Sequence, residues 1–301
     1  MGYDVRLTTD KVELHAFLQR DPIWAAYAIG DLEPAHFSWC TWHIAEDAAG
    51  RLAGLALLYR RLDPPVLLTV GEPVALAAIL QQMALPQRIY ISARQEHLPL
   101  LLALYDFSAD RVRPMLRMAV TAESFKPAST LSGPEPALRR LDSPDIPAIE
   151  ALIALGGPFA PDAFSPAQVA EGVFYGIELA SVGLAVLPRT ASPGCDASPL
   201  LAVAGTHLVA PAWGVAAVGN VYVHPAWGVA AVGNVYVHPA WRGRGYGAQV
   251  SSAVTSDLLQ RGHLVVLNVE QGNLAAIKLY RQLGFREHCP FVEGIAVTRN
   301  T

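Results

Sequence analysis

Apolar and polar residues recur along this chain with two different periods. Short runs rich in valine, isoleucine and aromatic residues predict strands. We expect these strands at residues 5–7, 39–43, 51–59, 66–70, 88–92, 116–121, 138–141, 174–177, 182–187, 200–209 and 264–269. Apolar residues three to four positions apart predict helices at residues 11–19, 73–83, 98–105, 146–153 and 248–260. Strands and helices mixed in this order predict an α/β (α+β) fold.

One stretch follows neither period and predicts a boundary between two parts of the chain. Residues 126–136 contain three prolines and small residues without an apolar pattern, which is typical of a linker. We therefore expect an N-terminal domain over residues 1–125, a linker over 126–136 and a C-terminal domain over 137–301.

The densest motif of the chain joins a strand pattern to a helix pattern. Val235, Tyr236 and Val237 suit a strand, which Pro239 ends because proline has no N–H for a ladder. The turn that follows alternates glycine with other residues: Arg242, Gly243, Arg244, Gly245, Tyr246, Gly247 and Ala248. Glycine permits sharp bends and close approach, and a helix N-terminus offers unpaired N–H groups. With two arginines beside it, this turn predicts a phosphate-binding site.

Two better-known phosphate motifs do not fit the turn. A P-loop needs a lysine that is absent here, and a dinucleotide-binding turn has the spacing G-x-G-x-x-G at the start of a βαβ unit. Here the spacing is G-x-G-x-G, near the end of the chain and led by an arginine. An ordinary glycine-rich β–α turn is the alternative interpretation.

A second block of residues follows the strand pattern at 264–269. Asn273 is a residue type that favours a helix N-cap, and Gly284 suits the position just after a helix. Tyr280 lies seven residues after Asn273, two turns along the same helical face.

Together, the two blocks resemble the GNAT N-acetyltransferase superfamily. Arg242, Gly245 and Gly247 match its acyl-CoA-binding pattern (Arg/Gln)-x-x-Gly-x-(Gly/Ala), and the block from Asn273 matches N-x-x-A-x-x-x-Y-x-x-x-G-F. The resemblance is specific over residues 200–286. It implies a mixed, mostly antiparallel central sheet flanked by helices in the C-terminal half. Residues 1–122 resemble a degenerate GNAT-like half without a Gly-x-Gly turn, which implies a tandem arrangement.

The resemblance also implies a co-substrate, acetyl-CoA, held where two parallel strands splay. The strand before the turn would bind the pantetheine arm, the turn would wrap the pyrophosphate, and an asparagine would contact the cofactor beyond the splay. The implied cofactor-binding residues are Val235, Tyr236, Val237, Arg242, Gly243, Arg244, Gly245, Tyr246, Gly247, Ala248 and Asn273. Tyr280 would protonate the departing thiolate, with a core aromatic as its alternative role.

The sequence offers two candidates for the general base. Some members of the resembled family place a glutamate five residues before the asparagine, where this chain has Asn268. Glu270 lies on the same strand face and is the candidate base, with a solvated strand end as its alternative. His238 is a second candidate, because histidine titrates near neutral pH. The nine histidines and three cysteines show no metal-ligand spacing, so no metal site is expected.

An internal repeat precedes the turn. Residues 211–227 recur without change at residues 225–241, with a period of 14. Only the second copy adjoins Arg242, so we expect Val235 to Val237 to be the functional strand. We expect the first copy to pair at the sheet edge or to pack on a neighbour, since exposure of large apolar side chains costs about 1.5–3 kcal/mol each. Both copies offer the same side chains, which leaves an exchange of register open.

Composition narrows the class of protein. A chain of 301 residues with 52% hydrophobic and 16% charged residues is not disordered. Its net charge of −4 argues against a nucleic-acid partner, and the lack of a long uninterrupted apolar run argues against a membrane span. The first residues lack a signal-peptide pattern, and the three cysteines are far apart, so we expect a cytoplasmic protein with free thiols.

The sequence thus predicts an N-acetyltransferase that moves an acetyl group from acetyl-CoA to a primary amine of a small molecule, amino acid or protein. Two alternatives stay open: a non-catalytic CoA-binding or regulatory module, and a nucleotide-binding protein that uses the turn differently. Acceptor specificity is expected to lie in residues 156–168 and 188–199.

Overall fold

The structure is a computed structural model that describes residues 2–129, 136–155, 164–179, 200–206, 208–210, 215–217 and 235–299. Only the backbone is described at 108–111, 208–210 and 215–217. The strand predicted at 182–187 and the segments 156–163 and 188–199, expected to contribute to acceptor specificity, lie outside the described residues.

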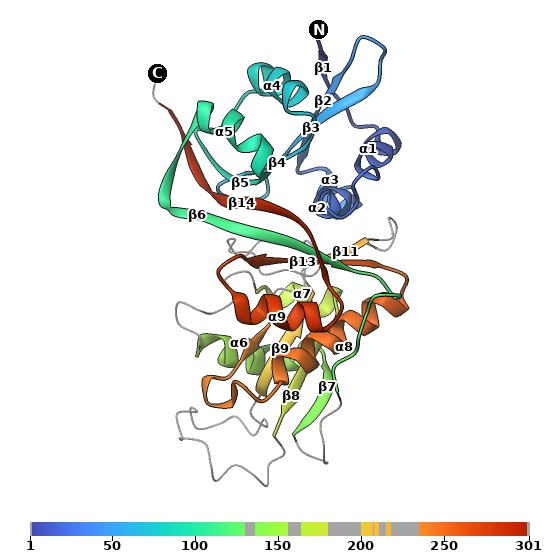
Figure 1. Cartoon of the computed structure of the whole chain (residues 1–301), viewed down its shortest axis with the longest axis vertical. Helices are drawn as coiled ribbons and strands as arrows, with labels where there is room; N and C mark the ends of the chain where they lie inside the picture. The colour runs from blue at the N-terminus through green and yellow to red at the C-terminus, as the bar shows by residue number, and fades with distance from the viewer. Residues whose placement is uncertain are drawn as a thin grey trace.

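The predicted elements follow the expected order; three short helices at 26–30, 34–37 and 166–171 and one long strand at the end of the chain were not predicted (Figure 1). The strands are β1 (Asp4–Leu7), β2 (Cys40–Glu46), β3 (Leu52–Tyr59), β4 (Val66–Gly71), β5 (Arg88–Arg94), β6 (Tyr105–Val120), β7 (Ala137–Leu141), β8 (Phe174–Glu178), β9 (Leu200–Gly205), β10 (Leu208–Ala210), β11 (Val215–Ala217), β12 (Tyr236–Val237), β13 (Leu264–Glu270) and β14 (Arg286–Thr298). The α-helices are α1 (Lys11–Leu18), α2 (Ala26–Gly30), α3 (Pro34–Phe37), α4 (Pro73–Gln82), α5 (Leu98–Leu104), α6 (Ile146–Ala154), α7 (Pro166–Glu171), α8 (Tyr246–Gln260) and α9 (Leu274–Gln282). Short 3₁₀ turns are η1 (Gln95–His97), η2 (Ser143–Asp145) and η6 (Pro239–Trp241).

The strands form two sheets. One has the order β1-β2-β3-β4-β5-β14-β6-β13-β11-β10, and the other has the order β12-β9-β8-β7. Within the described residues, the pairs β4–β5 and β11–β13 are parallel and the remaining pairs are antiparallel. The expected mixed, mostly antiparallel sheet flanked by helices is therefore confirmed.

The two halves of the chain exchange long strands. β6, from the first half, lies between β14 and β13, while β14, from the end of the chain, lies between β5 and β6. Figure 1 shows both strands crossing the middle of the molecule. β14 follows β6 with register shifts at Glu287/Cys289 and at Gly294/Ala296, and such bulges let a long strand bend. The predicted domain limits stay a prediction; the larger sheet runs through both halves.

The hydrophobic core is likewise shared. One large cluster joins Trp24 and Leu14 of the first half to Tyr280 and Val254 of the second, with Phe291 of β14 among them. The rings of Trp24 and Phe291 pack edge to face, with their centroids 5.4 Å apart. A second cluster lies under α4 in the first half and contains Leu76 and Ile79. Burial of a side chain such as Phe291 contributes about 1.5–3 kcal/mol, so the exchanged strand stabilises both halves.

The repeat is divided between the two sheets. Val215 to Ala217 of the first copy form β11, which pairs with both β10 and β13. The first copy therefore pairs in the sheet interior rather than at the predicted edge. Tyr236 and Val237 of the second copy form β12 opposite Val203 and Ala202 of β9. Residues 218–234 lie outside the described residues.

Candidate active site

The glycine turn adopts a backbone conformation that requires glycine. Gly243 and Gly245 have φ of +78° and +81°, a left-handed region that costs other residues about 1–2 kcal/mol. A Cβ at either position would meet no atom within 4 Å, so conformation, not space, sets the requirement. Gly245 caps α8 without a side-chain hydrogen bond. The first-turn N–H groups of α8 therefore follow an exposed turn and have no side-chain cap, as an anion site needs.

Aromatic rings hold the two arginines of the turn. Arg242 Nε donates to the Val237 carbonyl at 3.2 Å, and its guanidinium lies over the Tyr236 ring at 5.5 Å. The Arg244 guanidinium lies 4.5 Å from the centre of the Trp241 ring. Both arginines are exposed, so their remaining N–H groups can still meet a phosphate.

A split between strands lies next to this turn. β13 pairs with β11 only over Leu264 to Val266, and β12 pairs with β9 in the other sheet. Leu267 to Glu270 of β13 consequently have no partner on that side among the described strands. Gly247, unlike Gly243 and Gly245, has close neighbours: a Cβ at this position would be 3.5 Å from Val237 Cγ2 and 3.6 Å from Leu279 Cδ1. The first turn of α8 therefore packs closely against both β12 and α9.

The second motif is formed by α9. Asn273 Oδ1 accepts the Ala276 N–H at 3.1 Å, so the predicted N-cap is confirmed. Gly284 has φ of +91° just after the helix, as predicted. Tyr280 is buried and packs edge to face on Phe285, with the two ring centroids 5.7 Å apart. Burial raises the pKa of Tyr280, so the phenol is protonated at neutral pH and is a weaker acid than a solvated tyrosine.

The two predicted candidates for the base occupy unequal positions. Glu270 is exposed at the end of β13. His238 Nδ1 accepts the Ala240 N–H at 3.2 Å, and burial together with the Arg242 cation lowers the pKa of His238. His238 therefore helps to form the turn η6. Neither side chain is placed next to Asn268, which is 1% exposed.

A carboxylate that the sequence analysis missed does contact Asn268. Glu293, on β14, accepts a hydrogen bond from Asn268 Nδ2 at 3.3 Å and is 2% exposed. Burial raises the pKa of Glu293 to about 7. The available signal was a single acidic residue between apolar runs at 291–292 and 295–297. Its partner on β13 is 25 residues away in sequence and could not be inferred from spacing.

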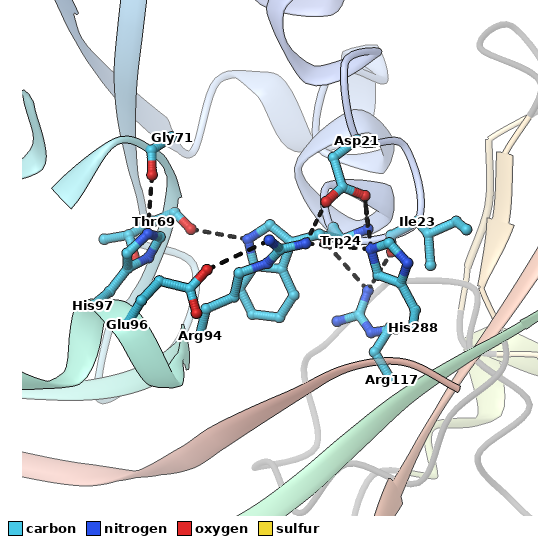
Figure 2. A network of polar contacts seen from close by, with 10 residues as sticks. All are labelled: Asp21, Ile23, Trp24, Thr69, Gly71, Arg94, Glu96, His97, Arg117 and His288. Carbon is cyan, nitrogen blue, oxygen red and sulfur yellow. Dashed lines mark hydrogen bonds and ion pairs between the residues drawn. The ribbon is translucent and has the colours of Figure 1, made fainter. Parts of the chain in front are cut away.

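In the first half, the corresponding pair of strands is filled by side chains. β4 and β5 pair in parallel only from Val66 to Leu68. Beyond that point the Thr69 carbonyl accepts Trp24 Nε1 at 3.0 Å, and His97 bonds the Gly71 carbonyl at 3.0 Å and Thr69 Oγ1 at 2.9 Å (Figure 2). The backbone acceptors that a ligand would use along β4 are therefore already paired.

Figure 2 also shows how the region around Trp24 and β5 contacts the second half of the chain. Asp21 pairs with Arg94 and with His288 Nε2, the latter at 2.9 Å. Burial opposes its ionisation, but His288, the Trp24 N–H and Arg94 hold the pKa of Asp21 at about 2. Asp21 is therefore ionised at neutral pH and ties β14 to the segment before α2.

Among the described side chains, no group of three or more His, Cys, Asp or Glu residues is placed to hold a metal ion. Within the same part of the chain, no helix is long and apolar enough to cross a membrane.

Comparisons with known proteins agree with this geometry. The model of the FR47-like protein family matches residues 218–292, which include the glycine turn, α8, β13 and α9. No curated protein matches the chain.

Several solved structures share the fold at low sequence identity. An X-ray structure of a Drosophila protein is 13% identical, covers 100% of both chains and has a TM-score of 0.67. A tandem GNAT protein from the clavulanic acid biosynthesis pathway is also 13% identical over 100% of both chains, with a TM-score of 0.56. A GCN5-related N-acetyltransferase from Sphaerobacter thermophilus is 15% identical, covers 99% of this chain and 97% of its own, and has a TM-score of 0.55.

Proposed function

Since this chain has the GNAT fold in a tandem arrangement, we propose that it is an acyl-CoA-dependent N-acyltransferase that transfers an acetyl group from acetyl-CoA to a primary amine. The amine would belong to a small molecule, an amino acid or a protein. The observation that carries the proposal is the split between β12 and β13, flanked by the uncapped N-terminus of α8.

The chemistry of the split suits a thioester co-substrate. Uncapped N–H groups at the start of α8, with Arg242 and Arg244 beside them, can pair with pyrophosphate oxygens. Unpaired backbone groups of β12 and β13 can bond the amide groups of the pantetheine arm. The Tyr280 hydroxyl, at the end of a buried side chain on α9, can give its proton to a leaving thiolate.

The first test is calorimetric titration with acetyl-CoA. We compare the parent protein with Gly245→Trp, in which a large side chain fills the turn. Gly262→Trp is the matched control, because Gly262 has φ of +78°, follows the far end of α8 and has open space around it. Binding that is lost only in Gly245→Trp supports the site. Equal binding in all three proteins contradicts it.

One observation favours a second candidate, a non-catalytic CoA-binding module. Asn268 stands where a carboxylate would face the split, and Glu270 is exposed at the strand end. Release of thiol from acetyl-CoA in the presence of a panel of primary amines distinguishes the two candidates. Binding without release for every amine would favour the module.

A further inference from the structure

A buried polar cluster lies where the two halves of the chain meet. Asn268 of β13 donates through Nδ2 to Glu293 Oε1 at 3.3 Å and to Tyr27 Oη of α2 at 3.2 Å. Tyr90 of β5 donates its hydroxyl to Glu293 Oε2 at 3.2 Å. The cluster therefore draws on both halves and on the exchanged strand β14, which makes it a product of the tandem arrangement.

One acceptor of the cluster lacks a donor within the described part of the chain. Asn268 Oδ1 is buried and has no partner among the described residues. The orientation of the amide is set by Glu293, which accepts from the Nδ2 side. A buried acceptor left unpaired costs about 1–3 kcal/mol. An amide oxygen beside a carboxylate is completed by a ligand that brings N–H donors and positive charge, which is the chemistry of a primary ammonium group.

The position of the cluster relates it to the split. Asn268 lies two residues beyond Val266, the last residue of β13 that pairs with β11. It is therefore at the point where the split begins. Its side chain faces α2 through Tyr27, whereas α9, which carries Tyr280, lies on the other side of β13 (Figure 1). A thioester held in the split would be reached from the α2 side by an amine and from the α9 side by the Tyr280 hydroxyl.

Burial and the charged groups around Glu293 together set the pKa of its carboxyl group. Burial raises its pKa to about 7, while Arg113, Arg117 and the Tyr90 hydrogen bond act in the opposite direction. Arg117 lies opposite Asn268 in the β6–β13 pair. Its Nη1 donates to the carbonyls of Ile23 at 3.0 Å and Trp24 at 3.2 Å, while its Nε is buried and has no partner among the described residues. A carboxylate that titrates near the working pH is suited to general base catalysis.

We propose that Asn268 and Glu293 form the acceptor-amine subsite of the acyl transfer, in which Asn268 Oδ1 orients the ammonium group and Glu293 takes its proton. This inference rests on the proposed function. One ammonium proton passes to Glu293, and the freed amine attacks the thioester carbon to form the C–N bond. The C–S bond then breaks, the departing thiolate takes the Tyr280 proton, and the second proton of the new amide nitrogen returns to the Tyr280 phenolate. The products are the amide, the free thiol and one proton, which Glu293 releases to water.

The test uses the full chain with acetyl-CoA and butylamine as the probe amine. We compare the parent with Glu293→Gln, and with Glu287→Gln as a matched control on the exposed start of β14. We expect Glu293→Gln to lower kcat about 100-fold or more, with the Kd for acetyl-CoA unchanged. The inflection of kcat/KM near pH 7 should disappear in this variant. The double variant Asn268→Glu/Glu293→Gln, which moves the carboxylate to β13, should recover part of the rate and a new inflection.

Thermal unfolding measures binding of the amine without any need for turnover. Butylammonium should raise the melting temperature of the parent and of Glu287→Gln, and leave that of Glu293→Gln unchanged. Retention of rate, pH inflection and thermal protection in Glu293→Gln would overturn the subsite. The subsite would also be overturned if the parent binds acetyl-CoA but its melting temperature does not rise with butylammonium. Absence of acetyl-CoA binding in the parent would instead overturn the proposed function.

Discussion

Removal of one copy of the repeat is expected to stabilise the protein and to preserve its fold. The reason is the register of the hairpin that β9 and β10 form with β11 and β12. If the pairing of Leu208 with Ala217 is continued along the chain, Tyr222 falls opposite Val203. In the structure that place is taken by Tyr236, the same residue of the second copy. The two described pairings are therefore those of one continuous hairpin with a single repeat unit inserted.

The perturbation is the deletion of residues 218–231. Because the copies are identical, any other 14 consecutive residues within 211–241 give the same product. In the present chain 18 residues lie between Ala217 and Tyr236. After the deletion 4 residues remain there, and loop closure becomes easier by about 1.3 kcal/mol on the logarithmic length dependence. That corresponds to a rise in melting temperature of about 3–5 °C, before any gain from new strand pairs.

Differential scanning calorimetry and titration with acetyl-CoA measure the two consequences. We expect a higher melting temperature, with binding of acetyl-CoA retained because the turn from Arg242 to Ala248 is untouched. A control in which residues 218–231 are replaced by glycine and serine keeps the length and should gain nothing. A deletion product that is less stable than the parent, or that no longer binds acetyl-CoA, would refute the register argument.

The remaining predictions concern single residues. Glu293 has a folded-state pKa of about 7 against an ordinary 4.5, so the folded state holds the proton more tightly and stability falls as pH rises through 7. Glu293→Gln removes this dependence, so its free energy of unfolding relative to that of the parent should increase between pH 5 and pH 8, by up to about 3 kcal/mol. Denaturant unfolding at each pH measures this difference, and a constant difference would speak against the prediction. Gly245→Ala should weaken acetyl-CoA binding and cost about 1 kcal/mol of stability, whereas Gly262→Ala should cost the same stability without loss of affinity. Because Trp24 and His97 occupy the backbone acceptors of β4, calorimetry should give one acetyl-CoA per chain; a stoichiometry of two would contradict this reading.

Local chemistry made the glycine turn and its neighbours predictable. A left-handed turn before a helix needs glycine within a few residues, and the structure has Gly243 and Gly245 in that conformation. The cap at Asn273 and the end of α9 at Gly284 depend on contacts within one helical turn. These features were predicted from sequence, and the comparison with FR47-like proteins covers the same segment. The roles assigned to Tyr280 and the cofactor-binding residues stay predictions.

The exchange of β6 and β14, and with it the contact between Asn268 and Glu293, was decided by the tertiary structure. Residues 286–298 gave no strand prediction, since Pro290 and Gly294 interrupt the apolar pattern. Their partners lie on β5 and β6, almost two hundred residues earlier in the chain. Turns and helix ends are fixed by neighbours a few positions away, so the sequence alone determined them. Strand order and the burial of Glu293 depend on which distant strands pair, and that is settled only when both halves pack around one core.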